Sequence, residues 1–168
     1  MNNPFGSLLL QLQARIKAVA SAIREVNEDK GQLEGYELRP AVSFPCVLID
    51  FDFQFDDLGD NIQMASGNVI VRLAFPPFSS AGSLMPQGVR EKALAYTDYE
   101  MQVYQALHGW RPTGFAPLSR RAAVTEKRTD TIRVREIRFD TQFEDYSAAD
   151  EHSNVSINNF EVSGEFTS

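Results

Sequence analysis

The sequence predicts an α+β fold in one domain, with two helices packed on a mainly antiparallel sheet of about four strands. Apolar residues recur at spacings of three and four in two separate stretches, which is the period of an amphipathic helix. In other stretches apolar and polar residues alternate, which is the period of a strand with one face in solvent. These strand stretches follow one another in pairs joined by polar turns, so we expect antiparallel hairpins.

The length and charge of the chain bound the possible classes of protein. With 168 residues it can bury a core without disulfide bonds or metal. We expect a domain over residues 1–146 and an acidic, polar C-terminal arm over residues 147–168. The formal net charge of −7 repels nucleic acids and anionic membranes. The single cysteine, Cys46, has apolar neighbours and is expected to be a buried thiol.

The N-terminal region predicts the first helix. Either Asn3 or Ser7 could cap its start, because each offers a side-chain oxygen to free backbone N–H groups. Polar, glycine-containing residues at 27–35 are expected to end it. The first residues lack the basic region of a secretion signal, and no apolar run reaches membrane-spanning length, so we expect a cytoplasmic protein. The buried face of this helix is expected to carry Leu9, Leu12, Ile16, Val19, Ile23 and Val26.

A long hairpin is predicted next. Strict alternation begins at Val47, with polar residues between the apolar ones, and predicts a strand with one wet face. Residues 56–61 read as the turn and residues 62–75 as the returning strand, with a bulge expected at Gly67. The apolar face of the first strand is expected to carry Val47, Ile49, Phe51, Phe53 and Phe55.

The second half of the domain is expected to contain one helix and a second hairpin. Residues 76–88 are rich in Pro, Gly and Ser, so they predict an irregular loop. A helix is expected over residues 89–108, stopped by Gly109 and Pro112. Strands are expected over residues 120–126 and 131–143, and a bulge near residues 135–136 would reconcile the two apolar phases of the second strand.

The densest acidic group could in principle hold a divalent cation, because Mg²⁺ and Ca²⁺ are bound by carboxylate oxygens. Alternation, however, places its first two members on the wet face of a strand and the others in a turn, and no calcium-loop register fits. We interpret the group as a solvated strand face that discourages edge pairing, with a metal-dependent enzyme as the alternative. The group consists of Asp50, Asp52, Asp56, Asp57 and Asp60.

The sequence shows no catalytic or cofactor motif. Its two histidines, His108 and His152, have no partner at metal-ligand spacing, and His108 is expected to cap helix carbonyl groups. A nucleophile elbow, a phosphate-binding loop and a dinucleotide fingerprint are all missing from the sequence. We therefore predict a protein that is not an enzyme and that needs no cofactor and no metal.

The charges are segregated along the chain, which indicates a candidate subunit interface. A basic tract covers residues 111–138, whereas the residues from Asp140 onward include no Lys or Arg. Opposite patches on one molecule suit head-to-tail association, although a solvated sheet face and, third, nucleic-acid binding stay open. The interface is predicted to pair Arg120, Arg121, Arg133, Arg135 and Arg138 with Asp50, Asp52 or the C-terminal arm of a neighbour.

The order helix, long hairpin, helix, hairpin resembles the phage tail terminator family, which is the minor tail protein U-like, head–tail joining family. The likeness covers residues 8–145 and includes residues 39–42 before the first strand and residues 137–140 near the end of the last. It implies a structural subunit, without catalytic residues, that forms a hexameric ring. A head–tail connector or a tail-completion protein would show the same order of elements and the same hydrophobic pattern.

The resemblance also implies partners and a location. The expected partners are further copies of the chain, the tail tube protein and head-connector proteins, without membrane binding or specific nucleic-acid recognition. The expected location is the bacterial cytoplasm during assembly, and then the tail or neck of a virion.

Overall fold

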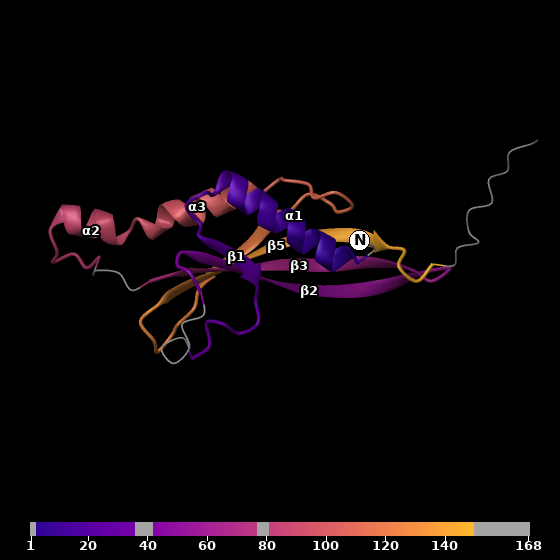
Figure 1. Ribbon diagram of the computed structural model, residues 1–168, viewed down its shortest axis with the longest axis horizontal. Coiled ribbons are helices and arrows are strands. Elements are labelled where there is room, and N and C mark those ends of the chain that lie inside the picture. Colours follow the sequence, from indigo (N-terminus) through magenta and orange to yellow (C-terminus); the bar gives the residue numbers. More distant parts are fainter. Residues whose placement is uncertain (1–2, 36–41, 77–80, 150–168) are drawn as a thin grey trace, which may run out of the picture.

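The computed structural model describes residues 3–35, 42–76 and 81–149. Five strands form one sheet in the order β1-β2-β3-β5-β4. They are β1 (Glu25–Glu28), β2 (Cys46–Gly59), β3 (Ile62–Phe75), β4 (Ser119–Thr125) and β5 (Arg133–Asp145). Every pairing is antiparallel except that of β1 with β2, which is parallel. Figure 1 shows α1 (Pro4–Val19) and α3 (Tyr96–Leu107) on one side of this sheet, whereas α2 (Gln87–Ala93) lies beyond its end. The predicted α+β class with a mainly antiparallel sheet is confirmed, and β1 is a strand that the sequence did not reveal.

The first helix is shorter than predicted. Asn3 caps it, because its Oδ1 accepts hydrogen bonds from the N–H groups of Phe5 and Gly6 at 3.0 and 3.2 Å. The helix ends at Val19, so the expectation that Ile23 and Val26 share its face is wrong. Ile23 is nevertheless buried, and Val26 lies in β1 opposite Val47. One apolar side chain in a four-residue strand cannot reveal a period of two. The helical spacing of three and four therefore extends to Ile23 and Val26 only by coincidence. The buried face of α1 carries Leu8, Leu12 and Ile16.

The long hairpin of β2 and β3 is confirmed, and its turn is tighter than predicted. Asp60 and Asn61 have φ values of 53° and 57°, the left-handed pair that a two-residue hairpin turn requires. The bulge expected at Gly67 is absent from the register, in which Gly67 pairs with Phe53 and with Thr141. Glycine is needed there because a Cβ would lie 2.1 Å from the backbone oxygen of Asp52.

The sheet buries apolar side chains on both faces at one end, and this explains the two phases of β5. Val134 packs with Leu48 and Cys46 in a small cluster on the face opposite the helices. Ile137 and Phe139 belong to the main core beneath the helices. The bulge expected near residues 135–136 is therefore wrong, because pairing with β3 runs on without a shift and the only irregularity between the two last strands falls between Arg120 and Ala122.

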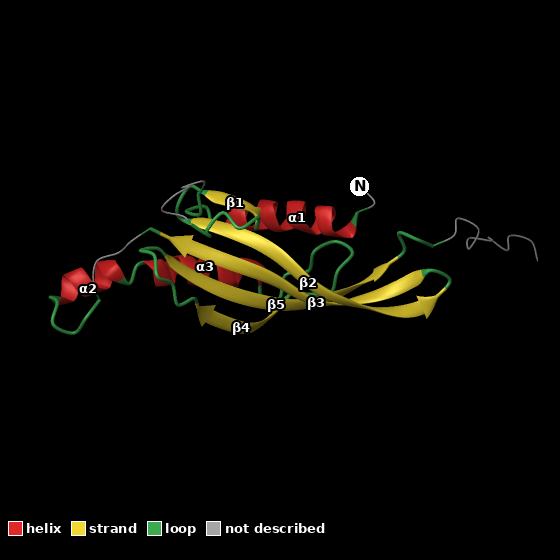
Figure 2. Cartoon of the chain, turned by 90° about the horizontal axis from the view of Figure 1, so that it is seen from below, coloured by secondary structure: helices red, strands yellow, loops and turns green. Residues whose placement is uncertain are grey.

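The main core lies between the sheet and the two helices α1 and α3. At the hairpin end it becomes an aromatic cluster, where the Phe5 ring lies 5.5 Å from Phe51 and 5.8 Å from Phe143. Phe115, from the segment between α3 and β4, packs against Phe143 with the two rings tilted at 55° and a centroid distance of 4.7 Å. Figure 2 shows the same sheet turned by 90°, with the β2–β3 hairpin extending past the helices.

The helix predicted over residues 89–108 is two helices. Both the N–H and the Oγ1 of Thr97 bond the carbonyl of Leu94, so a new helix starts where the first ends. Gly109, with φ 77°, stops α3 as expected. The predicted strands at residues 120–126 and 131–143 are found within two residues of their expected bounds. Residues 39–41, residues 77–80 of the predicted loop and residues 150–168 of the predicted arm lie outside the described residues.

Candidate assembly surfaces

Three arginines of the predicted interface come together on the side of the sheet that carries α3. Arg135 donates from Nε to Oε1 of Glu100 at 3.0 Å. The guanidinium of Arg133 lies 4.0 Å from the ring centroid of Tyr96, and that of Arg120 lies 3.8 Å from Tyr104. Glu100, Tyr96 and Tyr104 all belong to α3. The three arginines therefore bind α3 to the sheet.

The same three arginines also line a groove of about 310 Å³, which we call the basic groove. Thr97 and the half-exposed side chain of Met101 complete its wall. Arg133 and Arg135 point away from Val134, as alternation predicts, but α3 covers that face, so both are only partly exposed. Arg120 is exposed. The positive charge is thus accessible through a groove rather than across a flat sheet.

The other predicted interface residues lie on the opposite, open face of the sheet. Arg138 pairs with Glu136 at 2.6 Å, and Arg121 pairs with Asp140 at 2.5 Å. Asp50 and Asp52 are exposed on this face and form no ion pair within the described residues. The register places Asp50 across Ile70 from Arg138. The predicted basic tract is therefore divided between two faces, and only part of it forms one surface.

The acidic group does not converge. Successive side chains of β2 point to opposite faces, so Asp56 and Asp57 point apart, and Asp60 lies in the hairpin turn. In the part of the chain that the structure describes, no three His, Cys, Asp or Glu side chains are grouped so as to hold a metal ion. The geometry gives the metal-dependent enzyme alternative no support.

Neither Cys46 nor His108 has the environment of a nucleophile or a general base. Burial is the main cause that raises the pKa of Cys46 to about 12, so the group is a neutral thiol at physiological pH. His108 accepts a hydrogen bond at Nδ1 from the N–H of Arg120 at 3.1 Å and stacks on Tyr104. His108 is the C-cap residue of α3 and bonds the carbonyl of Tyr104 through its backbone N–H at 2.9 Å, whereas its side chain joins the end of α3 to β4.

A cluster of ion pairs that the sequence does not predict lies on the open face. Arg72 of β3 bonds Glu126 at 2.6 Å and Asp29 at 2.9 Å, and Arg128 bonds Asp130 at 2.6 Å. Burial alone raises the pKa of Glu126, but the hydrogen bonds from both arginines outweigh it and hold that pKa below its usual range. The hydrogen bond from Arg128 likewise lowers the pKa of Asp130. Arg128 lies only two residues from both Glu126 and Asp130, but Arg72 is 54 residues from Glu126 and 43 from Asp29, so no spacing in the sequence could have predicted its pairs.

Two further features at opposite ends of the molecule were also missed. The first is a projecting segment over residues 81–95, which contains α2. From here on we call this segment the arm; it is distinct from the predicted C-terminal arm. The second is a groove of about 570 Å³ between the start of α1, the turn at Gly114 and the end of β5, which we call the end groove. The signal for the arm is Leu84 and Met85 inside a stretch of loop-forming residues. None of the described helices combines the length and apolarity of a membrane span.

Comparison with known proteins gives a fold and no family. No protein-family description matches the chain, and neither does any curated protein. Among solved structures, a chain of the virion of the native gene transfer agent (GTA) particle is similar. The TM-score is 0.52 at 17% sequence identity, and the match covers 84% of this chain and 98% of that chain. At this identity the likeness shows a shared fold.

Proposed function

We propose that this chain is a structural subunit of a phage or prophage tail, which forms a ring that terminates the tail tube and joins it to the head. The observation that carries the proposal is the fold likeness to a virion chain, since almost the whole of that chain is matched. A role in assembly also agrees with a surface that offers grooves and a projecting arm. The chain would act in the host cytoplasm during assembly and remain in the tail or neck.

The ring would be built head to tail, with a hexamer as the expected closed form. One end of the molecule presents the basic groove, whereas residues 50–71 contain five aspartates and no Lys or Arg. A heterologous contact between unlike surfaces generates a ring when its rotation closes. Exposed ion pairs contribute about 0 to 1 kcal/mol each, so charge sets the register while apolar contacts hold the ring together. Its other partners would be the tail tube protein and head-connector proteins.

A head–tail connector or tail-completion protein is the second candidate, because a shared fold with a virion chain supports any position at the head–tail joint. The two candidates differ in the surface to which the ring binds. A terminator binds the end of the tail tube, and a connector binds the head opening. Binding to isolated tubes or to isolated heads therefore separates them.

The experiment is electron microscopy of the pure chain, followed by mixing with tail tubes made without it. Rings that bind one end of the tube and limit its length support the terminator. Rings that bind heads but not tubes support the connector. A chain that stays monomeric, alone and in the presence of tubes and heads, overturns the proposal for both. Asp50→Asn with Asp52→Asn should leave thermal stability equally insensitive to Mg²⁺, which is the matching check on the enzyme alternative.

A further inference from the structure

The arm exposes apolar side chains far from the core. Leu84 is 99% exposed, and Leu94 and Met85 are 43% and 38% exposed. Ala93 is the only buried residue of α2, and α2 has no extensive contact with another described helix or strand. In Figures 1 and 2 the arm extends past the end of the sheet. Such a projecting apolar surface is typical of a segment that packs against another molecule.

The arm is too short to be stable as a helix by itself. Isolated helices of fewer than about 12 residues are marginal in water even with favourable sequences. The helix α2 has seven residues, Gly88 near its start and no side-chain cap on its first N–H groups. Contacts outside the subunit would supply the stabilisation that its own core does not.

The end groove has the complementary properties. Its floor is apolar, because Phe115 and Phe143 line it and both are nearly buried in the aromatic cluster. Its rim is acidic, because Glu144 and Asp145 lie at the end of β5, and residues 139–149 contain no Lys or Arg. The groove therefore suits an apolar segment that carries positive charge.

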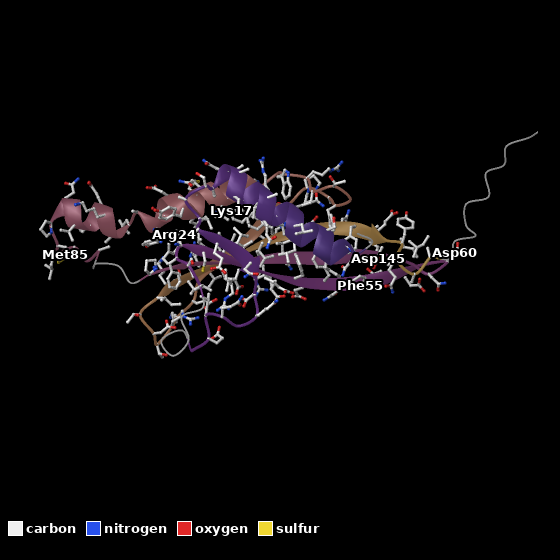
Figure 3. The ribbon with its side chains drawn as sticks, in the orientation of Figure 1. Lys17, Arg24, Phe55, Asp60, Met85 and Asp145 are labelled. Carbon is white, nitrogen blue, oxygen red and sulfur yellow. The ribbon has the colours of Figure 1, made fainter. Side chains whose placement is uncertain are left out.

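The arm is such a segment. Arg90 and Lys92 lie on α2 between the apolar residues Met85 and Leu94, and with Glu91 between them the arm has a net charge of +1. The arm cannot reach the end groove of its own subunit, because Met85 and Asp145 lie toward opposite ends of the molecule in Figure 3. The basic groove adjoins the arm, since Tyr96 directly follows it and lines that groove. One end of the molecule therefore carries positive charge and exposed apolar side chains. The other carries acidic residues around a groove with an apolar floor, which the 57% exposed side chain of Tyr146 also lines.

We propose that the arm of one copy of this chain docks into the end groove of the next copy and so forms the contact that closes the ring. The inference rests on the proposed ring function and names its interface. Leu84 and Met85 enter the apolar floor over Phe115 and Phe143, while Arg90 and Lys92 lie against Glu144 and Asp145. The occupant is a second copy, because the arm supplies apolar side chains that suit the apolar floor and positive charge that is complementary to the acidic rim.

The test uses two defective chains and one matched control, analysed by sedimentation and electron microscopy. The arm variant is Leu84→Glu with Met85→Glu, and the groove variant is Glu144→Lys with Asp145→Lys. The control is Leu10→Glu on α1, a leucine that is also exposed, at 56%, but lies outside both surfaces. We expect the arm variant to lose at least about tenfold in association, because two large apolar groups stay in water. The groove variant should also assemble poorly, and the control should form rings.

Mixing the two defective chains gives the decisive result. The arm of the groove variant and the end groove of the arm variant are both intact, so the mixture should form dimers that grow no further. Rings from the arm variant alone, at the wild-type yield, would overturn the docking and leave the ring proposal standing. A wild-type chain that never associates would defeat both.

Discussion

The two faces of the sheet are built on different principles. The face beneath α1 and α3 carries a continuous apolar core that includes Leu12, Val71 and Phe139. Among the residues that the structure describes, the opposite face carries a small apolar cluster around Leu48 and then the ion pairs of Arg72 and Arg128. In Figure 1 the turn between β4 and β5 projects below the sheet, on the side away from the helices. Hydrophobic burial thus holds the regular elements, whereas charge pairs hold the irregular ones.

The largest expected effect is loss of a core aromatic ring. Phe139→Ala should lower the free energy of unfolding by about 3–5 kcal/mol, because it removes a fully buried ring and leaves a cavity among fixed neighbours. Urea unfolding measures this change. Ile70→Ala, on the open face of β3, is the control and should cost less than about 1 kcal/mol. Equal losses at both positions would mean that the two faces are equally packed in solution.

Removal of Arg72 should have the next largest effect. Arg72→Met leaves Glu126 and Asp29 without their main partner, and the side chains of Arg72 and Asp29 are only 14% and 11% exposed. We expect a loss of about 2–3 kcal/mol, below that of a fully buried pair because water still screens this one. Arg121→Met is the matched control, since its pair with Asp140 is far more exposed and contributes at most about 1 kcal/mol. If Arg72→Met lowers the free energy of unfolding no more than Arg121→Met does, the ion pairs of Arg72 are as well solvated as exposed pairs.

Acid should weaken the open face before it weakens the core. The pKa values of Glu126 and Asp130 are lowered in the folded chain. A lowered folded pKa gives stability that is present above the unfolded pKa, about 4.3 for Glu and 3.9 for Asp, and that is lost as pH falls through the folded pKa. Unfolding free energies measured from pH 6 down to pH 2 should therefore decline less steeply in Arg72→Met than in the wild type. Parallel curves would show that these carboxylates titrate normally.

The sequence predicted the core face well because its residues are periodic. The alternation of Val47, Ile49 and Phe51 places β2 and identifies its buried side, and the polar residues near Asp60 place the turn. The sequence did not predict β1, because Val26 is the single apolar residue of this four-residue strand and one residue shows no period. It also failed where both faces are buried, because Val134 and Ile137 are then both core residues, on opposite sides of one strand.

The surfaces were predicted less well than the core. The segregation of charge along the sequence identified Arg120, Arg133 and Arg135 as candidate interface residues, and in the structure these three line the basic groove. Sequence could not show that α3 covers two of them, because the pairing of Arg135 with Glu100 joins residues 35 positions apart. The arm and the end groove depend on which segments the fold leaves uncovered. That property belongs to the tertiary structure.

The smallest expected change in stability separates the two roles of the basic groove. Arg120→Gln removes an exposed cation from the ring of Tyr104, a contact worth about 0.5–1 kcal/mol, so the free energy of unfolding should fall by no more than that. The backbone N–H of Arg120 still bonds His108, because the substitution leaves the backbone unchanged. Association should respond more than folding does, since the same charge recurs at every contact of a ring, and its dependence on salt should become weaker. Arg111→Gln, another exposed arginine but one outside the groove, should alter neither quantity. If both variants assemble with the wild-type salt dependence, the groove arginines serve only to bind α3 to the sheet.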